Sequence, residues 1–426
     1  MITTLYNWAS VAATPFLPLF LQARMRAGKE DPARLRERMG WSDLPRPEGA
    51  LVWLHAASVG ETMSSLVLIE KILEENPAVS ILLTTGTVTS ADMAAKRLPP
   101  RAIHQYCPVD VPRWVGRFLD HWRPDAALWI ESEIWPTLVQ RTKRAGIPMA
   151  LVNARLSQRS KERWAKARNT FRSLVSAFSV VLCQTEEGAE SFRMFGIHQA
   201  ESVGNLKFSA PALPVDADEL AALRGCIGKR PVWLAASTHP GEEELVLETH
   251  TRLRSSFPGL LTIIVPRHPS RALEIETILK ARIPAVARRT VDKLIGDEVE
   301  LYIADTLGEL GLFYALTPVA YIGGGMGTLG GHNPIEPAQQ NTAILYGPDR
   351  GNFTTVAKQL EDAGAAQVVS DARALSDAVS TLLSNHDECT RRSDVAATVA
   401  KQNSGIVDVV MERLRPLLPS TAGDRK

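Results

Sequence analysis

Short apolar runs alternate with segments in which apolar residues recur every three or four positions, and this order repeats through most of the chain. A continuous apolar run is typical of a buried strand, whereas the wider spacing is typical of an amphipathic helix. Strands are predicted at Leu51–His55, Ile81–Thr85, Ala126–Ile130, Met149–Val152, Val180–Cys183, Val232–Ala236, Leu261–Val265, Leu301–Ile303, Val319–Ile322 and Ala343–Leu345. Because strands that alternate with helices pair in the same direction, the pattern predicts an α/β protein with parallel sheets.

The predicted strands form two series with a linker between them. Ser209–Asp218 is rich in Pro, Ala and Asp, which favours an extended connection. The chain has 426 residues, and a single core stops growing at about 250–300 residues, so two domains are expected. We predict a membrane-anchor and basic segment at 1–40, an N-terminal Rossmann-like domain at 41–208, the linker at 209–218 and a C-terminal Rossmann-like domain at 219–426. The last helical pattern, Val407–Leu418, suits either domain.

The N-terminus has the composition of a membrane-associated segment. Leu5–Ala23 is largely apolar, and a basic cluster follows it, formed by Arg24, Arg26, Lys29, Arg34, Arg36 and Arg38. Such a cluster is expected to face the cytoplasm and to attract anionic lipids. The apolar stretch is shorter than the ~20 residues that cross a bilayer comfortably, and prolines interrupt it. A short tilted span, an in-plane anchor and a buried first helix all fit this pattern.

Charge and cysteine content exclude several classes of protein. The formal net charge is only +1, so the overall basic character of a nucleic-acid-binding protein is absent and no nucleic-acid partner is expected. The four cysteines stand far apart, without a C-x-x-C pair. This spacing argues against a zinc ribbon, an iron–sulfur site or a disulfide scaffold, and it favours a cytosolic location for the catalytic parts.

The loop after the first predicted strand contains a candidate general base. Ligands of parallel sheets bind beyond the carboxyl ends of the strands, so polar residues in these loops are candidates for chemistry. His55–Glu61 leaves the strand, Gly60 permits a tight turn, and Glu61 falls at the start of the next helix. The helix dipole favours the ionised carboxylate, which could take a proton from an acceptor hydroxyl. Alternatively, Glu61 only occupies a favourable first-turn position.

Two carboxylates follow the strand that ends at Ile130. Glu131 and Glu133 would point the same way if the chain stayed extended. Such a pair fits the acid and base of a glycoside hydrolase. Pro136 suits the first turn of a helix, so one of these residues could instead serve a helix start.

Two loops of the second series are candidates for anion binding. Ser237–Glu242 resembles a helix N-terminus, where free backbone N–H groups favour an anion. Arg267 lies in Pro266–Pro269 and offers a planar guanidinium group to a phosphate. Histidines in such loops more often complete local hydrogen bonding than bind metals, and no second histidine stands at metal-ligand spacing.

A glycine-rich stretch contains the letters of a dinucleotide-binding fingerprint. Gly325-x-Gly327-x-x-Gly330 matches G-x-G-x-x-G, and Asp349 follows near the expected distance. This is the basis of an alternative function, a nicotinamide-dinucleotide oxidoreductase. Against it, the fingerprint should open a helix at the third glycine, whereas His-Asn-Pro follows here.

A second interpretation of Gly323–Pro337 is a glycine-rich loop that closes around a nucleotide. A new helix would then begin near Pro334, and Glu336 early in this helix could accept hydrogen bonds from ribose hydroxyls.

Several motifs, in order along the chain, together resemble the 3-deoxy-D-manno-octulosonic acid (Kdo) transferases, which are inner-membrane enzymes of lipopolysaccharide assembly. They are His55–Glu61, Glu131–Pro136, Asn153–Ser157, Gly204–Phe208, Ser237–His239, Pro266–Pro269, Asp305–Leu310 and Gly330–Pro337. The resemblance implies a GT-B fold, in which two Rossmann-like parallel-sheet domains face a cleft. It implies a CMP-Kdo donor, a lipid A precursor (lipid IVA) as acceptor, and no metal or cofactor. It also implies a cell inner membrane location, with the catalytic domains on the cytoplasmic side and anionic lipids nearby.

The resemblance also assigns roles to residues. It implies that Glu61 is the general base and that Glu131 and Lys207 act on the transition state. The implied CMP contacts are Arg267, His268, Gly308, Glu309, Leu310, Asn333, Pro334, Ile335 and Glu336. The family usually has Ser where this chain has Gly325, which affects the shape of the nucleotide loop. The expected activity is inverting glycosyl transfer, and the alternatives are the oxidoreductase and a membrane-tethered scaffold without catalysis.

Overall fold

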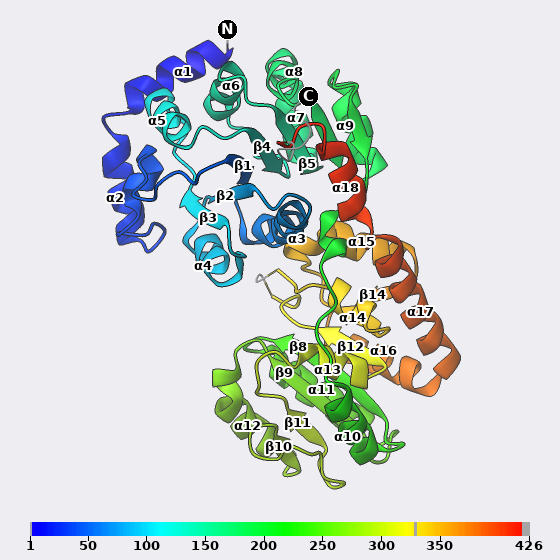
Figure 1. The fold of residues 1–426 in the computed structure, drawn as a ribbon. Coiled ribbons are helices and arrows are strands. Elements are labelled where there is room, and N and C mark those ends of the chain that lie inside the picture. The colour runs from blue at the N-terminus through cyan, green and yellow to red at the C-terminus, as the bar shows by residue number, and fades with distance from the viewer. Residues whose placement is uncertain (1, 328–329, 420–426) are drawn as a thin grey trace. The chain divides into compact units, whose positions relative to one another are not determined.

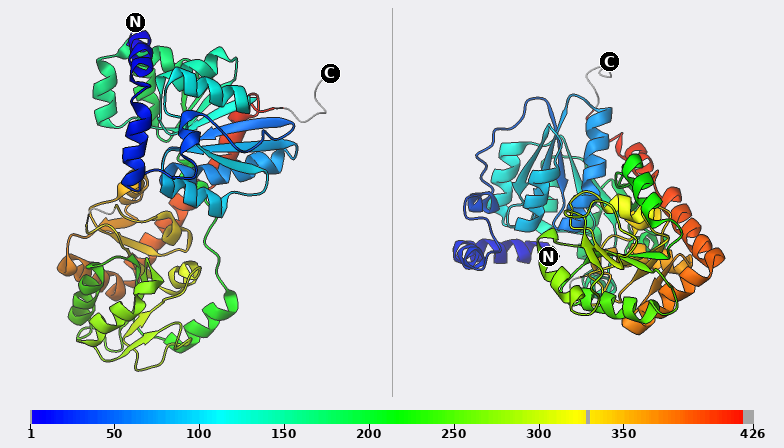
Figure 2. Two further views of the ribbon diagram at one scale, coloured as in Figure 1. Left: turned by 90° about the vertical axis from the view of Figure 1, so that its left-hand side faces the viewer. Right: turned by 90° about the horizontal axis from the view of Figure 1, so that it is seen from below.

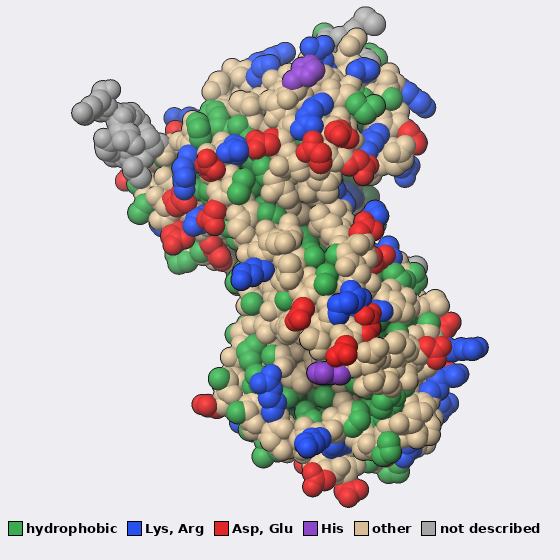
Figure 3. Space-filling model, turned by 90° about the vertical axis from the view of Figure 1, so that its right-hand side faces the viewer, with side chains coloured by type: hydrophobic (Ala, Val, Ile, Leu, Met, Phe, Trp, Pro, Cys, Tyr) green, Lys and Arg blue, Asp and Glu red, His purple; other side chains and the backbone are tan. Residues whose placement is uncertain are grey.

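A computed structural model describes residues 2–327 and 330–419, which form two compact units. Unit 1 comprises Met1–Ala210 and Gly405–Lys426, and unit 2 comprises Pro211–Ser404. Each unit has its own seven-stranded parallel sheet with helices packed on it (Figure 1). On the face shown in Figure 3, acidic and basic side chains are interspersed, as expected from the nearly balanced net charge of +1.

The sheet of unit 1 has the strand order β3-β2-β1-β4-β5-β6-β7, and every pairing is parallel. The strands are β1 (Ala50–His55), β2 (Val79–Thr85), β3 (Ala102–Tyr106), β4 (Ala126–Ile130), β5 (Met149–Ala154), β6 (Val180–Cys183) and β7 (Ala200–Ser202). Residues 51–55 of β1 are buried on both sides of the sheet, which explains why this strand is a continuous apolar run rather than an alternating one.

Helices cover the sheet of unit 1 and connect its strands. They are α3 (Val59–Glu75), α4 (Val88–Arg97), α5 (Pro112–Trp122), α6 (Pro136–Arg144), α7 (Gln158–Ala165), α8 (Arg168–Val175) and α9 (Glu186–Met194), with a 3₁₀ helix η2 (Leu206–Ser209). One core lies between the sheet and α5, α6, α8 and α9. Trp53 and Trp129 contact each other in this core, with ring centroids 4.8 Å apart.

The C-terminal helix of the chain belongs to unit 1. The predicted helical pattern Val407–Leu418 corresponds to α18 (Ile406–Leu414), which packs on α3 and η2. A guanidinium nitrogen of Arg413 lies 2.9 Å from the Glu201 carboxylate, and Lys71 of α3 lies 2.9 Å from Asp408. α18 therefore supports α3, the helix whose first turn contains Glu61.

Two short helices form the N-terminal segment. They are α1 (Ile2–Ala13) and α2 (Leu17–Arg26), followed by the 3₁₀ helix η1 (Leu35–Met39). Figure 2 shows α1 and α2 one after the other along one face of unit 1. The break between them coincides with Pro15, and Pro18 occupies the first turn of α2. Within residues 2–327 and 330–419, no helix has both the length and the apolar character needed to cross a membrane.

The sheet of unit 2 has the order β10-β11-β9-β8-β12-β13-β14, again with all pairings parallel. The strands are β8 (Val232–Thr238), β9 (Leu261–Pro266), β10 (Val286–Arg288), β11 (Leu301–Ile303), β12 (Val319–Ile322), β13 (Ala343–Tyr346) and β14 (Ala366–Val368). The helices are α10 (Ala217–Ile227), α11 (Glu242–Leu253), α12 (Ala272–Lys280), α13 (Leu310–Leu316), α14 (Ile335–Gln339), α15 (Thr354–Asp362), α16 (Ala372–Ser384) and α17 (His386–Gln402), with 3₁₀ helices η3 (Pro269–Arg271) and η4 (Gly351–Phe353).

In each sheet the direction of strand addition reverses next to the first strand. The reversal lies between β1 and β4 in unit 1 and between β8 and β12 in unit 2. Loops that leave neighbouring strands at such a point diverge and expose a crevice, which is where open parallel sheets bind ligands. The loops that contain Glu61, Glu131, His239 and the glycine-rich stretch all leave these four strands.

Candidate active site

Unit 1 brings together the three residues expected to be catalytic. Glu61 lies in the first turn of α3 after β1, Glu131 follows the neighbouring strand β4, and Lys207 lies in η2. All three side chains are largely buried.

Local capping fixes the Glu61 side chain. Ser58 is the extended N-cap residue of α3, and its hydroxyl accepts from the Glu61 amide at 3.3 Å. In return, Glu61 Oε1 accepts from the Ser58 hydroxyl at 2.9 Å and Oε2 accepts from the Ala57 amide at 2.7 Å. This arrangement is a variant of the capping box, because Glu61 reaches the amide of Ala57, one residue before the N-cap residue, instead of the Ser58 amide. Gly60 already lies inside α3, so the turn depends on Ser58 rather than on glycine.

The surroundings of Glu61 make its carboxyl group a weaker acid than usual. Only 7% of the residue is exposed. Burial and then the nearby Glu131 carboxylate raise the pKa of Glu61 to about 7, against the opposing hydrogen bonds from Ala57 and Ser58. A carboxyl group of this pKa exchanges its proton near neutral pH, which is what a general base requires.

Glu131 is held between two cations. Its Oε1 lies 3.5 Å from the Lys207 ammonium nitrogen, and its Oε2 accepts from Arg155 Nε at 3.1 Å. Burial lowers the pKa of Lys207, and the Glu131 carboxylate opposes this effect. The other carboxylate of the same loop, Glu133, accepts from the indole N–H of Trp135 at 3.0 Å. Glu131 and Glu133 therefore have different partners, and Pro136 begins α6.

A network of amide side chains positions Lys207, and sequence reasoning did not identify it. Asn153 Oδ1 accepts from the Leu206 amide at 3.0 Å, and Asn205 Oδ1 accepts from the Lys207 amide at 3.1 Å. Both Glu131 and Asn153 have left-handed backbone conformations, with φ values of 60° and 58°. Such strain at the ends of neighbouring strands is common at functional sites. Asparagine tolerates this conformation, but the letter alone does not reveal it.

In unit 2, a buried carboxylate organises the glycine-rich stretch. We call residues 323–334 the glycine loop; Thr328 and Leu329 lie outside the described residues. Glu242, the first residue of α11, accepts hydrogen bonds from the Gly324 amide at 2.8 Å, the Tyr321 hydroxyl at 2.8 Å and the His239 amide at 3.0 Å. The anionic group at this helix start therefore comes from the protein itself and ties the β8–α11 turn to the glycine loop.

The structure does not support the dinucleotide fingerprint. That motif should follow the first strand of its sheet and open a helix, whereas Gly325-x-Gly327-x-x-Gly330 follows β12 and the next helix starts at Ile335. The Asp349 carboxylate, expected to bind ribose in this interpretation, accepts from the Gly330 amide at 3.0 Å and from the Gly351 amide at 3.1 Å. Asp349 is therefore a structural support of the loop.

Two histidines join the glycine loop to the end of β8. The Nε2 atoms of His239 and His332 lie 2.8 Å apart, so one ring donates and the other accepts. Burial and then the nearby Arg267 lower the pKa of His332 to about 4. Gly324 has a positive φ of 81°, and a Cβ atom there would approach the His332 ring to 3.2 Å. The loop packs this tightly only because Gly324 has no side chain.

Arg267 and His268 are exposed at the end of β9. His268 contacts His239 edge to face, with ring centroids 6.1 Å apart. The neighbouring Arg271 is committed to Glu243, at 2.7 Å. The structure thus brings Arg267 and His268 to the same strand ends as the histidine pair.

The other expected CMP-contact residues fall into two groups. Gly308 has a positive φ of 87°, and Glu309 directly precedes α13, which begins at Leu310. The Glu309 carboxylate lies 2.7 Å from an Arg289 guanidinium nitrogen and also accepts from Thr306. Arg289 therefore lowers the pKa of Glu309.

The second group surrounds the start of α14. Asn333 Oδ1 accepts from the Ile335 amide at 3.1 Å, and Asn333 Nδ2 donates to Glu336 Oε1 at 3.2 Å. Pro334 and Ile335 are buried beneath them. Asn333 and Glu336 are thus fixed relative to each other directly after His332.

Comparisons with known proteins are consistent with this architecture. A family model described as 3-Deoxy-D-manno-octulosonic-acid transferase (kdotransferase) matches residues 33–210. The 3-deoxy-D-manno-octulosonic acid transferase of Rickettsia bellii (strain RML369-C) is 33% identical over 419 residues, which cover 97% of this chain and 99% of that protein. The corresponding transferase of Haemophilus influenzae (strain ATCC 51907 / DSM 11121 / KW20 / Rd) is 31% identical over 392 residues, covering 90% and 91%.

A solved structure supports the fold alone. The UDP-GlcNAc 2-epimerase from Neisseria meningitidis, bound to UDP-GlcNAc, has a TM-score of 0.57 at 12% identity and covers 86% of this chain and 100% of its own. This likeness supports two parallel-sheet α/β domains of the GT-B type. Because these two transferases are 33% and 31% identical to this chain over nearly their whole lengths, the chain belongs to the 3-deoxy-D-manno-octulosonic acid transferase family.

Proposed function

We propose that this chain is an inverting, metal-independent glycosyltransferase that moves Kdo from CMP-Kdo to a lipid A precursor (lipid IVA) in lipopolysaccharide biosynthesis. Its family supports Kdo transfer. The observation that carries the assignment is the Glu61 carboxyl group, which is buried at the carboxyl end of β1 beside Glu131 and has a pKa near neutrality. A carboxyl group in this state is suited to remove a proton from a sugar hydroxyl at physiological pH.

In the proposed reaction, Glu61 accepts the proton of the acceptor hydroxyl. The hydroxyl oxygen forms a bond to the anomeric carbon of Kdo, while the bond from that carbon to the phosphate oxygen breaks and CMP leaves from the opposite face. The configuration at the anomeric carbon is therefore inverted. Ser58 and Ala57 hold both oxygens of Glu61, so the base is oriented before the acceptor arrives.

Lys207 and Glu131 are proposed to respond to the charges that develop during transfer. Positive charge grows on the sugar ring and negative charge grows on the leaving phosphate. The Glu131 carboxylate suits the first and the Lys207 ammonium the second. Both are largely buried, where such interactions are stronger than in water.

The strand ends of unit 2 are proposed to bind CMP. Arg267 and His268 supply exposed donors for the phosphate. Gly308 to Leu310 and Asn333 to Glu336 are proposed to contact the nucleotide, with the Glu336 carboxylate suited to accept from ribose hydroxyls. The hydrogen bonds of Glu242 and Asp349 keep the glycine loop in one shape before the donor binds.

We also propose that the protein acts at the cytoplasmic face of the cell inner membrane, next to anionic lipids. The basic residues that follow α2 and the exposed apolar side chains of α1 and α2 support this location.

Product analysis tests the transfer directly. The purified protein is incubated with CMP-Kdo and a tetraacylated lipid A precursor, and the lipid is examined by mass spectrometry. We expect lipid products heavier by one or more Kdo residues, together with free CMP. A folded protein that gives no Kdo-bearing lipid would overturn the assignment. CMP is expected to raise the melting temperature and NAD to leave it unchanged, whereas the reverse would favour the oxidoreductase.

A further inference from the structure

The first helix presents its polar side to the protein and its apolar side to the surroundings. On the inner side, Asn7 Oδ1 accepts from the Thr137 hydroxyl at 2.9 Å, and Asn7 Nδ2 donates to Gln140 at 3.4 Å. The neighbouring Tyr6 hydroxyl forms a hydrogen bond with the Asp110 carboxylate, and burial and then this carboxylate raise the pKa of the hydroxyl. Hydrogen bonds therefore hold this side of α1 to α6 and to the residue Asp110 that precedes α5. This is the reverse of an ordinary surface helix.

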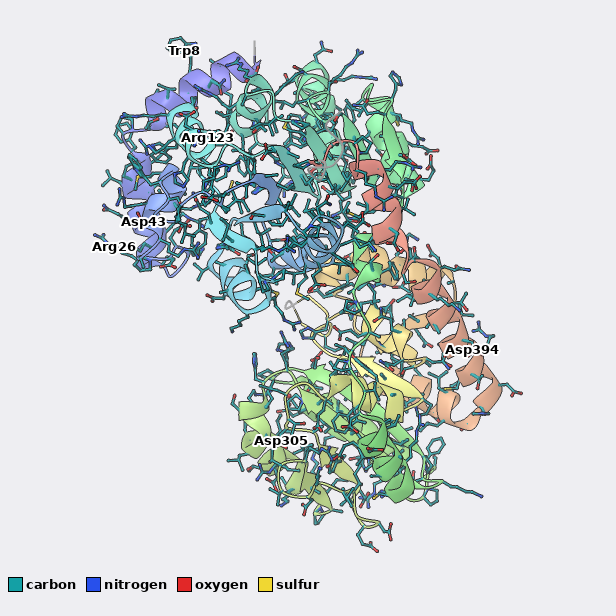
Figure 4. All side chains as sticks on the ribbon, in the orientation of Figure 1. Trp8, Arg26, Asp43, Arg123, Asp305 and Asp394 are labelled. Atoms are coloured by element: carbon teal, nitrogen blue, oxygen red, sulfur yellow. The ribbon has the colours of Figure 1, made fainter. Side chains whose placement is uncertain are left out.

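The outer side of α1 is an apolar stripe. Leu5, Trp8 and Val11 are spaced three residues apart, so they line one face of the helix. Leu5 and Trp8 are each 71% exposed, and Figure 4 shows Trp8 pointing away from unit 1.

Exposed apolar side chains also follow α1, with Phe16 at the break and Leu19 and Phe20 in α2. Between them, Leu21 turns inward and is buried against Val111 and Trp114. The segment is therefore anchored to unit 1 and still leaves six large apolar side chains uncovered. We call Leu5, Trp8, Val11, Phe16, Leu19 and Phe20 the apolar strip. Six large exposed apolar side chains within 16 residues mark a segment that binds an apolar partner.

The basic residues next to the apolar strip divide into two sets. Three are used inside the fold: Arg24 lies 2.7 Å from Glu30, Arg38 lies 3.3 Å from Glu30 and Arg34 lies 2.8 Å from Glu37.

The other three, Arg26, Lys29 and Arg36, are exposed and make no ion pair with any residue in 2–327 or 330–419. Figure 4 shows Arg26 pointing outward from α2. These free cations identify the chemistry of the partner as anionic.

A second basic feature lies close to these residues on η1 and α5. The guanidinium carbon of Arg117 lies 3.8 Å from the centre of the Trp41 ring, and that of Arg36 lies 5.5 Å from it. Burial and then the neighbouring Arg113 and Arg36 lower the pKa of Arg117. A half-exposed indole with several guanidinium groups is typical of the boundary between lipid headgroups and acyl chains.

We infer that α1 and α2 lie in the plane of an anionic membrane surface, with the apolar strip among the upper acyl chains and with Arg26, Lys29 and Arg36 at the headgroups. This inference rests on the proposed membrane location and specifies its geometry. A helix that is held to unit 1 by polar side chains such as Asn7 and that exposes apolar side chains elsewhere can be covered by a bilayer without leaving unit 1. Apolar contact supplies the main attraction, and the free cations favour anionic lipids.

Depth measurements distinguish an in-plane helix from a spanning one. A nitroxide is attached in turn to Leu5→Cys, Trp8→Cys and Val11→Cys of the full chain, in a Cys226→Ser background because Cys226 is the only cysteine that is not buried among the described residues. The protein is bound to phosphatidylcholine vesicles containing phosphatidylglycerol. The access of each nitroxide to oxygen, relative to its access to a water-soluble nickel complex, then gives the depth of that nitroxide in the bilayer. The in-plane arrangement predicts nearly equal, shallow depths. A spanning helix would place positions 5 and 11 about 9 Å apart in depth, and this result would overturn the inference.

Vesicle sedimentation tests the residues themselves. We expect Leu5→Ser/Trp8→Ser/Val11→Ser to reduce the bound fraction at least tenfold. Leu273→Ser/Val291→Ser, which removes equally exposed apolar side chains from unit 2, should have no effect. We expect Arg26→Gln/Lys29→Gln/Arg36→Gln to abolish the preference for phosphatidylglycerol over pure phosphatidylcholine, and Arg373→Gln, an exposed arginine of α16, to preserve it. Unchanged binding by both multiple variants would refute the assigned surface.

The two proposals can fail separately. Sedimentation is performed without donor or acceptor, so it reports membrane binding whether or not the protein transfers Kdo. Transfer to an acceptor dispersed in detergent is measured in parallel. If the apolar-strip variant keeps this transfer and loses vesicle binding, the strip is a docking surface. If the wild-type protein binds vesicles at equal depth but transfers nothing, only the proposed reaction is wrong.

Discussion

The Lys207 ammonium nitrogen lies 3.5 Å from Oε1 of Glu131, and this contact joins η2 to the end of β4. It depends on Asn153 and Asn205, which hold the backbone on either side of Leu206. The two charges are buried together, so each reduces the cost of keeping the other ionised.

Replacing Lys207 by methionine is expected to lower kcat for Kdo transfer by about 10²–10³-fold, because one preformed charge interaction with the transition state is removed. Initial rates with CMP-Kdo give kcat and KM separately. Lys161→Met is the matched control, since Lys161 also pairs with a glutamate of unit 1, Glu187 at 3.2 Å. A Lys207→Met enzyme with normal kcat would exclude this role.

The rate of transfer should depend on pH through Glu61. Only the ionised carboxylate accepts a proton, so kcat/KM is expected to rise with pH and to level off above about 7, the pKa of Glu61. Glu61→Gln should lower kcat/KM by about 10²–10⁴-fold, and the remaining activity should no longer rise with pH. Glu133→Gln removes the weaker of the two charges that raise this pKa. This variant should keep the maximal rate, and the rise of kcat/KM should move slightly toward lower pH. If kcat/KM of Glu61→Gln still rose with pH in the same range, the titrating group would be a residue other than Glu61.

The free energy of unfolding should fall as pH rises, whereas the rate of transfer should increase. The folded protein binds the Glu61 proton more tightly than the unfolded chain does, because the pKa rises from 4.5 to about 7 on folding. The stability from this group is therefore complete below pH 4.5 and is lost as pH rises through 7. Glu61→Gln avoids the loss, so we expect it to raise the free energy of unfolding of unit 1 by up to about 3 kcal/mol at pH 8 and by little at pH 5. Denaturant titration at the two pH values measures the difference, and an equal effect at both would contradict the assigned pKa.

The glycine loop should depend on Glu242. Both oxygens of Glu242 accept hydrogen bonds: Oε2 accepts from the Gly324 and His239 amides, and Oε1 accepts from the Tyr321 hydroxyl and, at 2.9 Å, from the Gly324 amide. Glutamine has one acceptor oxygen, so its NH₂ group would face donors at one of these two positions. We therefore expect Glu242→Gln to reduce the rise in melting temperature produced by CMP by at least half. Glu244→Gln alters an exposed residue of the same helical turn and should leave the CMP effect intact. Equal CMP shifts in the two variants would show that the loop does not need this carboxylate.

The central strands could be predicted from sequence because burial makes them continuous apolar runs. All ten predicted runs correspond to strands. The four strands that were not predicted, β3, β7, β10 and β14, are the outermost strands of the two sheets. Each is only partly buried, with patterns such as the half-exposed Ala366–Val368. Outer strands pack on fewer neighbours, so their sequences contain polar residues that hide the signal.

The candidate site was predictable where the position of a residue follows from its close neighbours in the sequence. Ser58 and Glu61 have the spacing of a capping box, which places Glu61 at a helix start. The role of Glu242 could not be predicted, since its partners Tyr321 and Gly324 are distant in sequence and meet it only when β8 and β12 pair. The sequence also could not show which residues of the basic cluster form ion pairs. Only the fold shows that Arg24 pairs with Glu30, whereas Arg26 is exposed and makes no ion pair with a described residue.

The position of α18 has a consequence for synthesis on the ribosome. Unit 2 is one continuous segment, Pro211–Ser404, and can fold as soon as it has emerged, whereas unit 1 also needs α18 (Ile406–Leu414), which follows unit 2 in the sequence. Until α18 has left the exit tunnel, the sides of α3 and η2 that it covers are bare, and Glu201 lacks Arg413. The nascent chain therefore passes through a stage at which unit 2 is complete and unit 1, which contains Glu61, is not. A premature stop near codon 405 would release a protein with this defect.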